Sequence, residues 1–245
     1  MTKKWIKEAK RALYIAEKDV RIYFFKAPNL TFGLLLPVVL YLAFSINRTV
    51  DPVQAVPGLV AMASFFGSGA IQAISLPLER KTGTFNMLLT SPTTLSTIIL
   101  GKTLAGFFFG TILSVVYTGI VLPFTFLPNL PLFIVGILFS SLVFSAFGLF
   151  LSAPFRDIPE AMPPATVVRI AMVFLCGVFL PITDLPLSLQ TLAHLLPLTY
   201  SVDALRQTMV GNLNFHLFLT DLTVQTLFTI GFLIATTQIL KKSIK

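Results

Sequence analysis

Charged residues are scarce in this chain: of its 245 residues, only 11% are Asp, Glu, Lys or Arg. Hydrophobic residues make up 55%, and the mean hydropathy is +0.87. A soluble chain cannot bury that much apolar surface. The shortage of charge therefore excludes an ordinary soluble domain and indicates an integral membrane protein.

Four long runs contain no charged residue at all: 27–47, 52–78, 103–155 and 222–240. The shortest has 19 residues, and about 20 helical residues cross the roughly 30 Å of hydrocarbon in a bilayer. The runs lack the polar and apolar alternation of barrel strands. Because backbone groups in lipid must be bonded internally, we predict an all-α membrane protein.

Motifs for disulfide formation, metal binding and phosphate binding are also missing. Cys176 is the single cysteine and has no partner for an intrachain disulfide. His194 and His216 have no neighbours at metal-ligand spacing. The Gly101-Lys102-Thr103 triplet resembles the end of a phosphate-binding loop, but Ser96 stands where that motif requires glycine. We therefore expect no catalytic residue, no metal and no cofactor on this chain.

Carriers that run on ion gradients usually hold ionisable residues in mid-membrane, where a charge is costly. The four runs contain no Asp, Glu, Lys or Arg, which weighs against this class of protein. Asp157, Glu160 and Arg169, near the fifth predicted span, are the exceptions. They keep an ion- or proton-coupled secondary transporter open as the alternative function.

Residues 1–26 have the pattern of an amphipathic helix. Its apolar positions are Trp5, Ala9, Ala12, Leu13, Ala16, Val20 and Phe24, and its cations are Lys3, Lys7, Lys10, Lys18 and Arg21. Such a helix lies in the membrane interface with its cations near anionic headgroups. A solvated arm is the other interpretation.

Six membrane spans are predicted, at about 30–46, 57–76, 98–122, 132–152, 164–182 and 217–240. A cytoplasmic N-terminus places 16 of the 18 Lys and Arg inside and leaves only Arg48 and Arg206 outside, as the positive-inside rule favours. Both termini are then cytoplasmic. We expect residues 1–26 to be an interfacial segment and residues 27–245 to be one six-span domain, with no nucleic-acid partner.

Several spans carry small residues four apart, which lets helices approach closely. These are Gly106-x-x-x-Gly110, Ser141-x-x-x-Ser145 and Gly148-x-x-x-Ser152. The spacing predicts helix contact faces.

The most polar internal stretch lies between the second and third spans. It reads Glu79-Arg80-Lys81-Thr82-Gly83-Thr84-Phe85-Asn86-Met87-Leu88-Leu89-Thr90-Ser91-Pro92. A charged segment with a glycine and a terminal proline suits a short helix lying across a cytoplasmic partner. An ordinary inside loop is the alternative.

A second distinctive stretch follows the fifth span. It contains Gly177-Val178-Phe179-Leu180-Pro181, then Leu196-Pro197-Leu198-Thr199-Tyr200 and Asp203-Ala204-Leu205-Arg206, and ends at Gly211. Its prolines either simply break helices or form a hairpin that dips back into the outer leaflet. Asp203 and Arg206 are three residues apart and can pair on a helix.

These two segments resemble signatures of the type-2 ABC transporter permeases, six-helix subunits that pair with separate ATPases in bacterial and archaeal exporters. The resemblance implies that residues 1–26 form a connecting helix. It also implies an ATPase-coupling loop containing Glu79, Arg80, Lys81, Gly83, Thr84, Leu88 and Pro92, and an outer re-entrant hairpin containing Pro181, Pro197, Tyr200, Asp203 and Arg206. Asn86 stands where family members often carry Glu, and Ser91 is an additional residue before Pro92.

The resemblance further implies an exporter permease in the plasma membrane of a bacterium or archaeon. The permease would pair with a second copy or a related chain and with two ATPase subunits, which would bind the ATP and Mg. The chain itself would not be an enzyme. Its few buried charges favour an amphipathic or lipid-linked substrate such as a drug, a lipid or a glycan.

Overall fold

The computed structural model describes residues 2–23, 26–45, 52–125, 127–179, 181–210 and 213–244. Phe24, Arg48, Leu180 and Gly211, which entered the sequence predictions, lie outside these ranges. The elements in order are α1 (Thr2–Tyr23), α2 (Ala27–Leu30), the π-helix η1 (Thr31–Leu35), α3 (Leu36–Ser45), α4 (Pro52–Lys81), α5 (Thr84–Thr90), α6 (Leu95–Val121), the 3-10 helix η2 (Leu122–Phe124), α7 (Leu130–Ser152), α8 (Ile158–Leu175), the 3-10 helix η3 (Ile182–Asp184), α9 (Leu187–His194), α10 (Pro197–Met209) and α11 (Phe215–Ile244). The predicted all-α class is confirmed for the described residues.

Five helices in the described ranges are long and apolar enough to cross a membrane: α4, α6, α7, α8 and α11. They correspond to the second through sixth predicted spans. The first predicted span coincides with α2, η1 and α3, whose apolar part, Gly33–Ala43, is shorter than the others. The chain is thus a multi-pass membrane protein with five candidate spans in its described part.

The fifth span begins earlier than predicted, at Ile158 rather than near residue 164. The Asp157 carboxylate accepts a 2.7 Å hydrogen bond from the Ile158 amide, and Pro159 stands in the first turn, where proline is well tolerated. The helix also ends earlier, at Leu175, shortly before Gly177 with its φ of +76°. A left-handed residue of this kind commonly ends a helix.

Arg169 has a different environment from the one predicted. The positive-inside count places it on the cytoplasmic side, but it lies in α8 with its side chain buried against α4, and it donates a 2.8 Å hydrogen bond to the Gly69 carbonyl. Among the described residues it forms no ion pair, and its Nε atom has no hydrogen-bond partner. This guanidinium therefore contributes to the core and not to the cytoplasmic charge.

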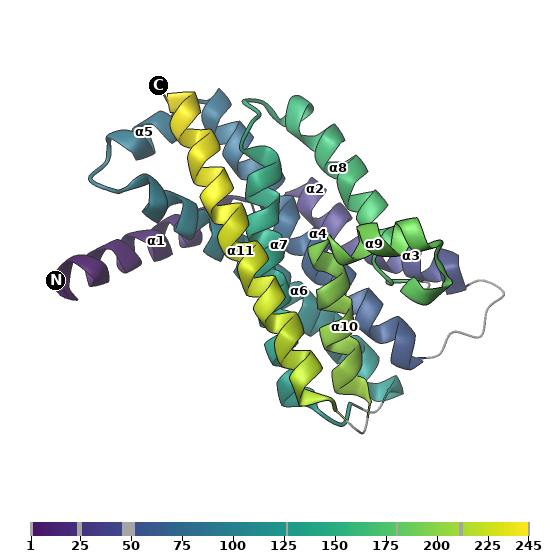
Figure 1. The fold of residues 1–245 in the computed structure, drawn as a ribbon. Coiled ribbons are helices and arrows are strands. Elements are labelled where there is room, and N and C mark those ends of the chain that lie inside the picture. Colours follow the sequence, from purple (N-terminus) through teal and green to yellow (C-terminus); the bar gives the residue numbers. More distant parts are fainter. Residues whose placement is uncertain are drawn as a thin grey trace.

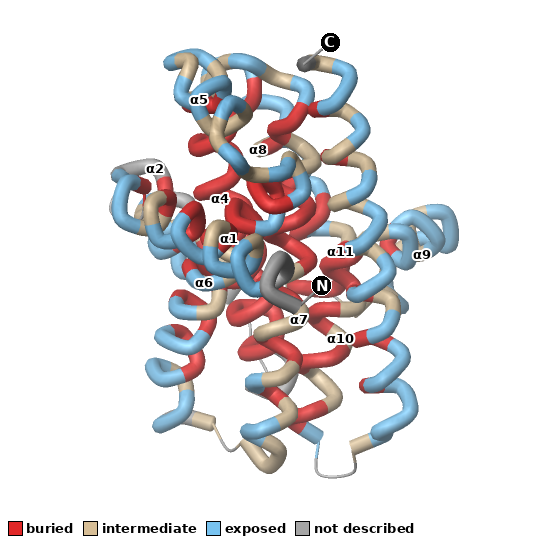
Figure 2. The backbone as a smooth tube through the Cα atoms, turned by 90° about the vertical axis from the view of Figure 1, so that its left-hand side faces the viewer, coloured by how far each residue is buried: buried red, intermediate tan, exposed pale blue. Residues whose placement is uncertain are grey.

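Helix α4 forms the centre of the bundle, and Figure 2 shows it buried along its length between the other helices. It packs mainly against α6 and α7. Phe65 on α4 contacts Phe144 on α7 edge to face, with ring centroids 4.8 Å apart. This is a favourable geometry for aromatic pairs.

The small-residue spacings lie at these contacts, which confirms their prediction as packing faces. A Cβ atom added at Gly110 would lie 1.8 Å from Ser68 Oγ on α4, and one added at Gly148 would lie 2.8 Å from the Gly69 Cα. The Ser64 and Ser141 hydroxyls are 2.7 Å apart. Only small residues such as Gly and Ser allow the helices to pack this closely.

Helix α5 and the C-terminal end of α11 lie at one end of the bundle, and the start of α11 lies at the other (Figure 1). Helix α1 lies crosswise to the long helices and packs against α6. Its buried stripe is Ala12, Ile15, Ala16, Asp19 and Tyr23, whereas Leu13, predicted on the apolar face, is 51% exposed. The face of α1 that meets the bundle therefore contains an acidic residue.

Candidate functional site

The polar stretch between the second and third spans divides into two parts with different roles. Helix α4 continues through Glu79, Arg80 and Lys81, and Gly83, with φ of +77°, turns the chain into α5. Glycine adopts this left-handed conformation without steric cost. The Thr82 hydroxyl donates a 2.9 Å hydrogen bond to the Leu78 carbonyl and so closes the end of α4.

Helix α5 is a short amphipathic helix on the surface of the bundle. Phe85 is buried, and Leu88 and Leu89 pack with it on a cluster that joins α1, α4, α6, α7 and α11. The opposite face of α5 exposes Thr84, Asn86, Met87 and Thr90, and Met87 is 71% exposed. Pro92 follows, also exposed. Of the residues predicted in the coupling loop, Thr84 and Pro92 thus lie at the surface and Leu88 faces the core.

Arg80 and Lys81 are bound to neighbouring helices. The Arg80 guanidinium donates hydrogen bonds to the Ala153 carbonyl at 2.6 Å and the Phe155 carbonyl at 2.9 Å, and it also bonds the Ser243 hydroxyl. Lys81 Nζ lies 2.6 Å from Asp157 Oδ2. This lysine lowers the pKa of Asp157 below its ordinary value, mainly through the hydrogen bond. Both cations therefore connect the end of α4 to the neighbouring ends of α7, α8 and α11. The predicted topology places these ends on the cytoplasmic side.

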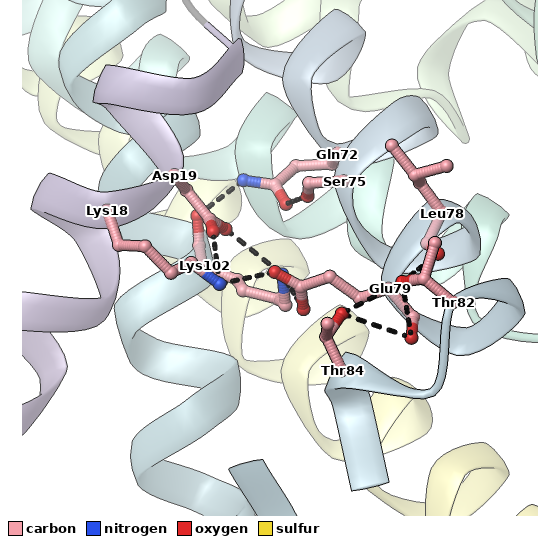
Figure 3. Close-up of polar contacts among 9 residues, drawn as sticks. All are labelled: Lys18, Asp19, Gln72, Ser75, Leu78, Glu79, Thr82, Thr84 and Lys102. Atoms are coloured by element: carbon pink, nitrogen blue, oxygen red, sulfur yellow. Dashed lines mark hydrogen bonds and ion pairs between the residues drawn. The ribbon is translucent and has the colours of Figure 1, made fainter. Parts of the chain in front are cut away.

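Glu79 is buried in a cluster of four charges that joins three helices (Figure 3). Lys102 Nζ on α6 lies 2.7 Å from Glu79 Oε2 and 3.0 Å from Asp19 Oδ2 on α1. Lys18 Nζ lies 2.9 Å from Asp19 Oδ1 and also contacts Glu79 Oε1. We call Lys18, Asp19, Glu79 and Lys102 the ion cluster. It contains two cations and two anions, so its formal charge is balanced.

The ion cluster is shielded from solvent on the α6 side. The side chains of Asp19, Glu79 and Lys102 are at most 3% exposed, whereas that of Lys18 is 35% exposed. Burial lowers the pKa of Lys18, but the carboxylates of Asp19 and Glu79 outweigh that effect and the net pKa is raised. Removing one partner from such a buried set leaves an uncompensated charge, at a cost of about 3–5 kcal/mol.

A second polar contact holds α1 to the start of α6. The Thr97 hydroxyl donates to the Glu8 carboxylate, and Arg11 Nη1 lies 2.9 Å from Glu8 Oε1. The Thr97 hydrogen bond is the main cause that lowers the pKa of Glu8. Between these two attachments α1 approaches α6 closely, because a Cβ atom at Gly101 would lie only 2.7 Å from the Ala12 carbonyl oxygen.

Asp19 and Lys102 were not predicted as site residues, although the sequence carries a signal for each. Asp19 lies three residues after Ala16 and seven after Ala12, so it falls on the apolar stripe of α1. Lys102 lies well inside the apolar helix α6. A charge in either position requires a buried partner.

The second predicted region lies around α9 and α10. Pro181 precedes η3 in extended conformation, and Pro197 is the first residue of α10. The Tyr200 hydroxyl donates a 2.7 Å hydrogen bond to the His194 carbonyl, joining α10 to the end of α9. The predicted pairing of Asp203 with Arg206 is confirmed at 3.3 Å, and Arg206 Nη2 also donates to the Gly177 carbonyl at 2.9 Å.

The two predicted regions are separate. The ion cluster and α5 lie toward one end of the bundle. The C-terminal end of α10 and the start of α11 lie at the other end (Figure 1). Each predicted set is thus brought together locally, but the two sets do not form a single site. Helix α10 packs against α4, α7 and α11, which connect this region to the rest of the bundle.

Comparison with known proteins places this arrangement in a family. A family model described as ABC-2 type transporter matches residues 17–210, which include the ion cluster, α5 and α10. A probable multidrug ABC transporter permease of Escherichia coli (strain K12), YbhR, is 27% identical over 155 residues, which are 62% of this chain and 42% of that protein. Nodulation protein J of Rhizobium leguminosarum bv. viciae is 33% identical over 72 residues, 29% of this chain and 28% of that protein.

The matched regions span less than half the length of each of these two relatives. The family model, in contrast, covers well over half of this chain, including the whole of the first segment on which the resemblance rested and the second segment up to residue 210. The protein belongs to the ABC-2 type transporter family.

Proposed function

We propose that this chain is the permease subunit of an ATP-driven exporter whose ATPase is a separate polypeptide. The observation that carries the proposal is the exposed face of α5, which the ion cluster and Arg80 hold beside α1 at one end of an apolar bundle. Family membership and the name of the Escherichia coli relative support it. The chain would transport without being an enzyme, and ATP and Mg would bind to the ATPase.

The proposed topology has six spans and places both termini in the cytoplasm. Helices α2, η1 and α3 would form the first span, because they follow one another without a break over 27–45, a stretch without charged residues. The positive-inside rule then puts α1, α5 and the C-terminal lysines on the cytoplasmic side. The location would be the plasma membrane of a bacterium or archaeon.

Helices α1 and α5 would act together as the coupling element. The ATPase would contact the exposed residues Asn86, Met87 and Thr90 of α5 and the outer face of α1. Glu79 would not touch the ATPase but would link α5 to α1 through Lys18 and Lys102. A push on α5 would then move the ends of α4 and α6 as one body, which is the kind of rigid motion that changes access to a path.

Helices α9 and α10 would form the outer re-entrant hairpin. Two contacts with α11 support this position: Gln207 Nε2 donates to Asp221 Oδ2 at 2.8 Å, and Gln225 Nε2 donates to the Tyr200 carbonyl at 3.3 Å. Gln225 lies ten residues after Phe215, the first residue of α11, or about 15 Å along the helix. The start of α10 would therefore lie near mid-membrane and its end near the outer surface.

The complete exporter would contain two permease chains, identical or related, and two ATPases. Exposed apolar side chains on α3 and α8, among them Val39, Leu42 and Val167, offer a face for the second chain or for lipid. Six spans are few to enclose a wide path alone, so the path would lie between the chains. The apolar bundle favours an amphipathic or lipid-linked substrate such as a drug, a lipid or a glycan.

The proposal is tested by copurifying the full chain in nanodiscs with candidate ATPases from the same genome. Met87→Glu places a charge in the centre of the exposed α5 face and should weaken the complex by about tenfold or more, as expected at the centre of an interface. Leu187→Glu is the matched control, because Leu187 is 80% exposed on α9, away from α5. It should leave ATPase binding unchanged.

Equal weakening by both variants would contradict the assignment of α5 as the ATPase contact. Transport that continues in vesicles without any ATPase would instead favour the alternative, an ion- or proton-coupled secondary transporter.

A further inference from the structure

A surface groove of about 430 Å³ lies between the first turns of α6 and the last turns of α11. Its size falls in the range of small-molecule sites. It is lined by Ser96, Ile99, Leu100, Leu233, Ile234, Thr237, Gln238 and Lys241. Apart from Thr237, whose hydroxyl donates to the Leu233 carbonyl, the lining residues separate into a polar end and an apolar end.

The polar end holds Ser96, Gln238 and Lys241, all of which are exposed. Within the described residues, none of these three side chains takes part in a hydrogen bond or an ion pair. A serine hydroxyl, an amide and an ammonium can all donate hydrogen bonds. Of the described residues, none that lines the groove carries a carboxylate, so its polar end is suited to an anion with several acceptor oxygens.

The apolar end consists of Ile99, Leu100, Leu233 and Ile234. Leu100 is 49% exposed and Ile234 is 54% exposed, so the groove is bordered by uncovered apolar surface. Lys241 and Leu233 are eight residues apart on α11, a rise of about 12 Å. That length approaches the roughly 15 Å half-thickness of the hydrocarbon core.

The polar end of the groove lies at the start of α6 and the end of α11, at the end of the bundle that carries α5. The Arg80 guanidinium bonds Ser243, two residues after Lys241, and it also bonds the carbonyls at the end of α7. Leu240 packs in the same buried cluster as Ile98 and Phe85. The groove thus runs from this end of the bundle toward mid-membrane with its donors at the water-facing end.

We propose that this groove binds an anionic phospholipid from the leaflet on the α5 side. Its phosphate lies against Ser96, Gln238 and Lys241, and one acyl chain follows Leu100 and Ile234. The combination of three unpartnered donors with an apolar channel about one leaflet deep fits a lipid better than a free phosphate, which would leave the channel uncovered. The lipid bridges α6 and α11 and is distinct from the exported substrate and from the ATPase contact.

The test uses the full chain in detergent, without ATPase or ATP, so its outcome is independent of the proposed exporter function. Phosphatidylglycerol and phosphatidylcholine with identical acyl chains are added in equal amounts, and bound lipid is counted by native mass spectrometry. The wild type should retain phosphatidylglycerol in preference. Lys241→Gln should reduce that preference by about five-fold, the effect of one cation near an anionic headgroup.

Lys242→Gln is the matched control, because Lys242 is exposed on the same helix but does not line the groove. It should leave the preference unchanged, and glycerol phosphate without acyl chains should not displace the lipid. Ile234→Trp fills the apolar end and should reduce binding of both lipids. Equal retention of the two lipids by the wild type, equal loss in the two lysine variants, or displacement by glycerol phosphate would overturn the proposal.

Discussion

Lys102 is a cation in the interior of an otherwise apolar helix, and its environment explains why it is tolerated. Its side chain is 1% exposed, yet its ammonium has a carboxylate on each side, from Asp19 and from Glu79. The carbonyl of the same residue accepts a hydrogen bond from Gln72, so α4 is bonded to both the main chain and the side chain of Lys102. The residue therefore joins α6 to α1 and α4 at one point.

Replacing Lys102 by Met should destabilise the protein more than any single change at the surface. The substitution keeps the volume of the side chain but leaves Asp19 and Glu79 close together with only the partly exposed Lys18 to compensate them. We expect a loss of about 3–5 kcal/mol of stability, measured by thermal unfolding in nanodiscs. Lys18→Met should cost less, because Lys18 is 35% exposed.

A double-variant cycle separates a pairwise interaction from a general packing defect. Asp19→Asn together with Lys102→Met removes one charge of each sign, so the combined loss should be smaller than the sum of the two single losses. Additive losses would show that the two side chains do not interact energetically, contrary to their 3.0 Å separation.

At the scale of elements, the contact of α1 with α6 depends on a glycine. A Cβ atom at Gly101 would lie 2.7 Å from the Ala12 carbonyl oxygen and 2.8 Å from the Ile15 Cβ. Both obstacles are backbone or the base of a branched side chain and cannot rotate away. Gly101→Ala should therefore push α1 off α6 and increase hydrogen–deuterium exchange in α1, while α4 and α7 stay protected.

Gly119→Ala is the control on the same helix, because nothing lies within 4 Å of its added Cβ. It should leave exchange in α1 unchanged, and it should even favour α6 slightly, since Ala is a better helix former than Gly by about 1 kcal/mol. If both variants behave alike, the close approach of α1 and α6 does not hold in the membrane.

At the scale of the whole molecule, the sequence predicts the long helices well because their signal is local. A charge-free run of about 20 residues implies a crossing wherever it occurs, and α4, α6, α7 and α11 begin within five residues of their predicted positions. The fifth span was predicted to begin near residue 164, whereas Asp157 caps α8 at Ile158, and Pro163 and Pro164 lie inside the helix.

The candidate site was predictable only as a stretch of chain. Gly83 and Pro92 mark the turns that bound α5, and these are properties of single residues. The inward orientation of Glu79 depends on Asp19 and Lys102, which lie 60 residues before it and 23 after it in the sequence. No local pattern specifies such a pairing. The sequence therefore placed Glu79 in the loop predicted to contact the ATPase, whereas in the structure Glu79 is buried and Met87 is exposed.

The number of spans can be tested by single-cysteine labelling in intact cells, since the native Cys176 is buried and should not react. The informative variants are Lys10→Cys, Thr90→Cys and Leu187→Cys, all at exposed positions. Three candidate spans, α6, α7 and α8, separate residue 90 from residue 187. An impermeant maleimide should therefore label Leu187→Cys from outside and Thr90→Cys only after the cells are permeabilised.

Lys10→Cys decides whether residues 27–45 cross the membrane. If they do, two crossings separate residue 10 from residue 90, and both cysteines should be protected in intact cells. Labelling of Lys10→Cys from outside would mean that α4 is the first crossing and that the chain has five spans. In that case α1 and α5 would lie on opposite sides, which the contact of Lys18 with Glu79 does not permit. The ion cluster therefore predicts that six spans will be found.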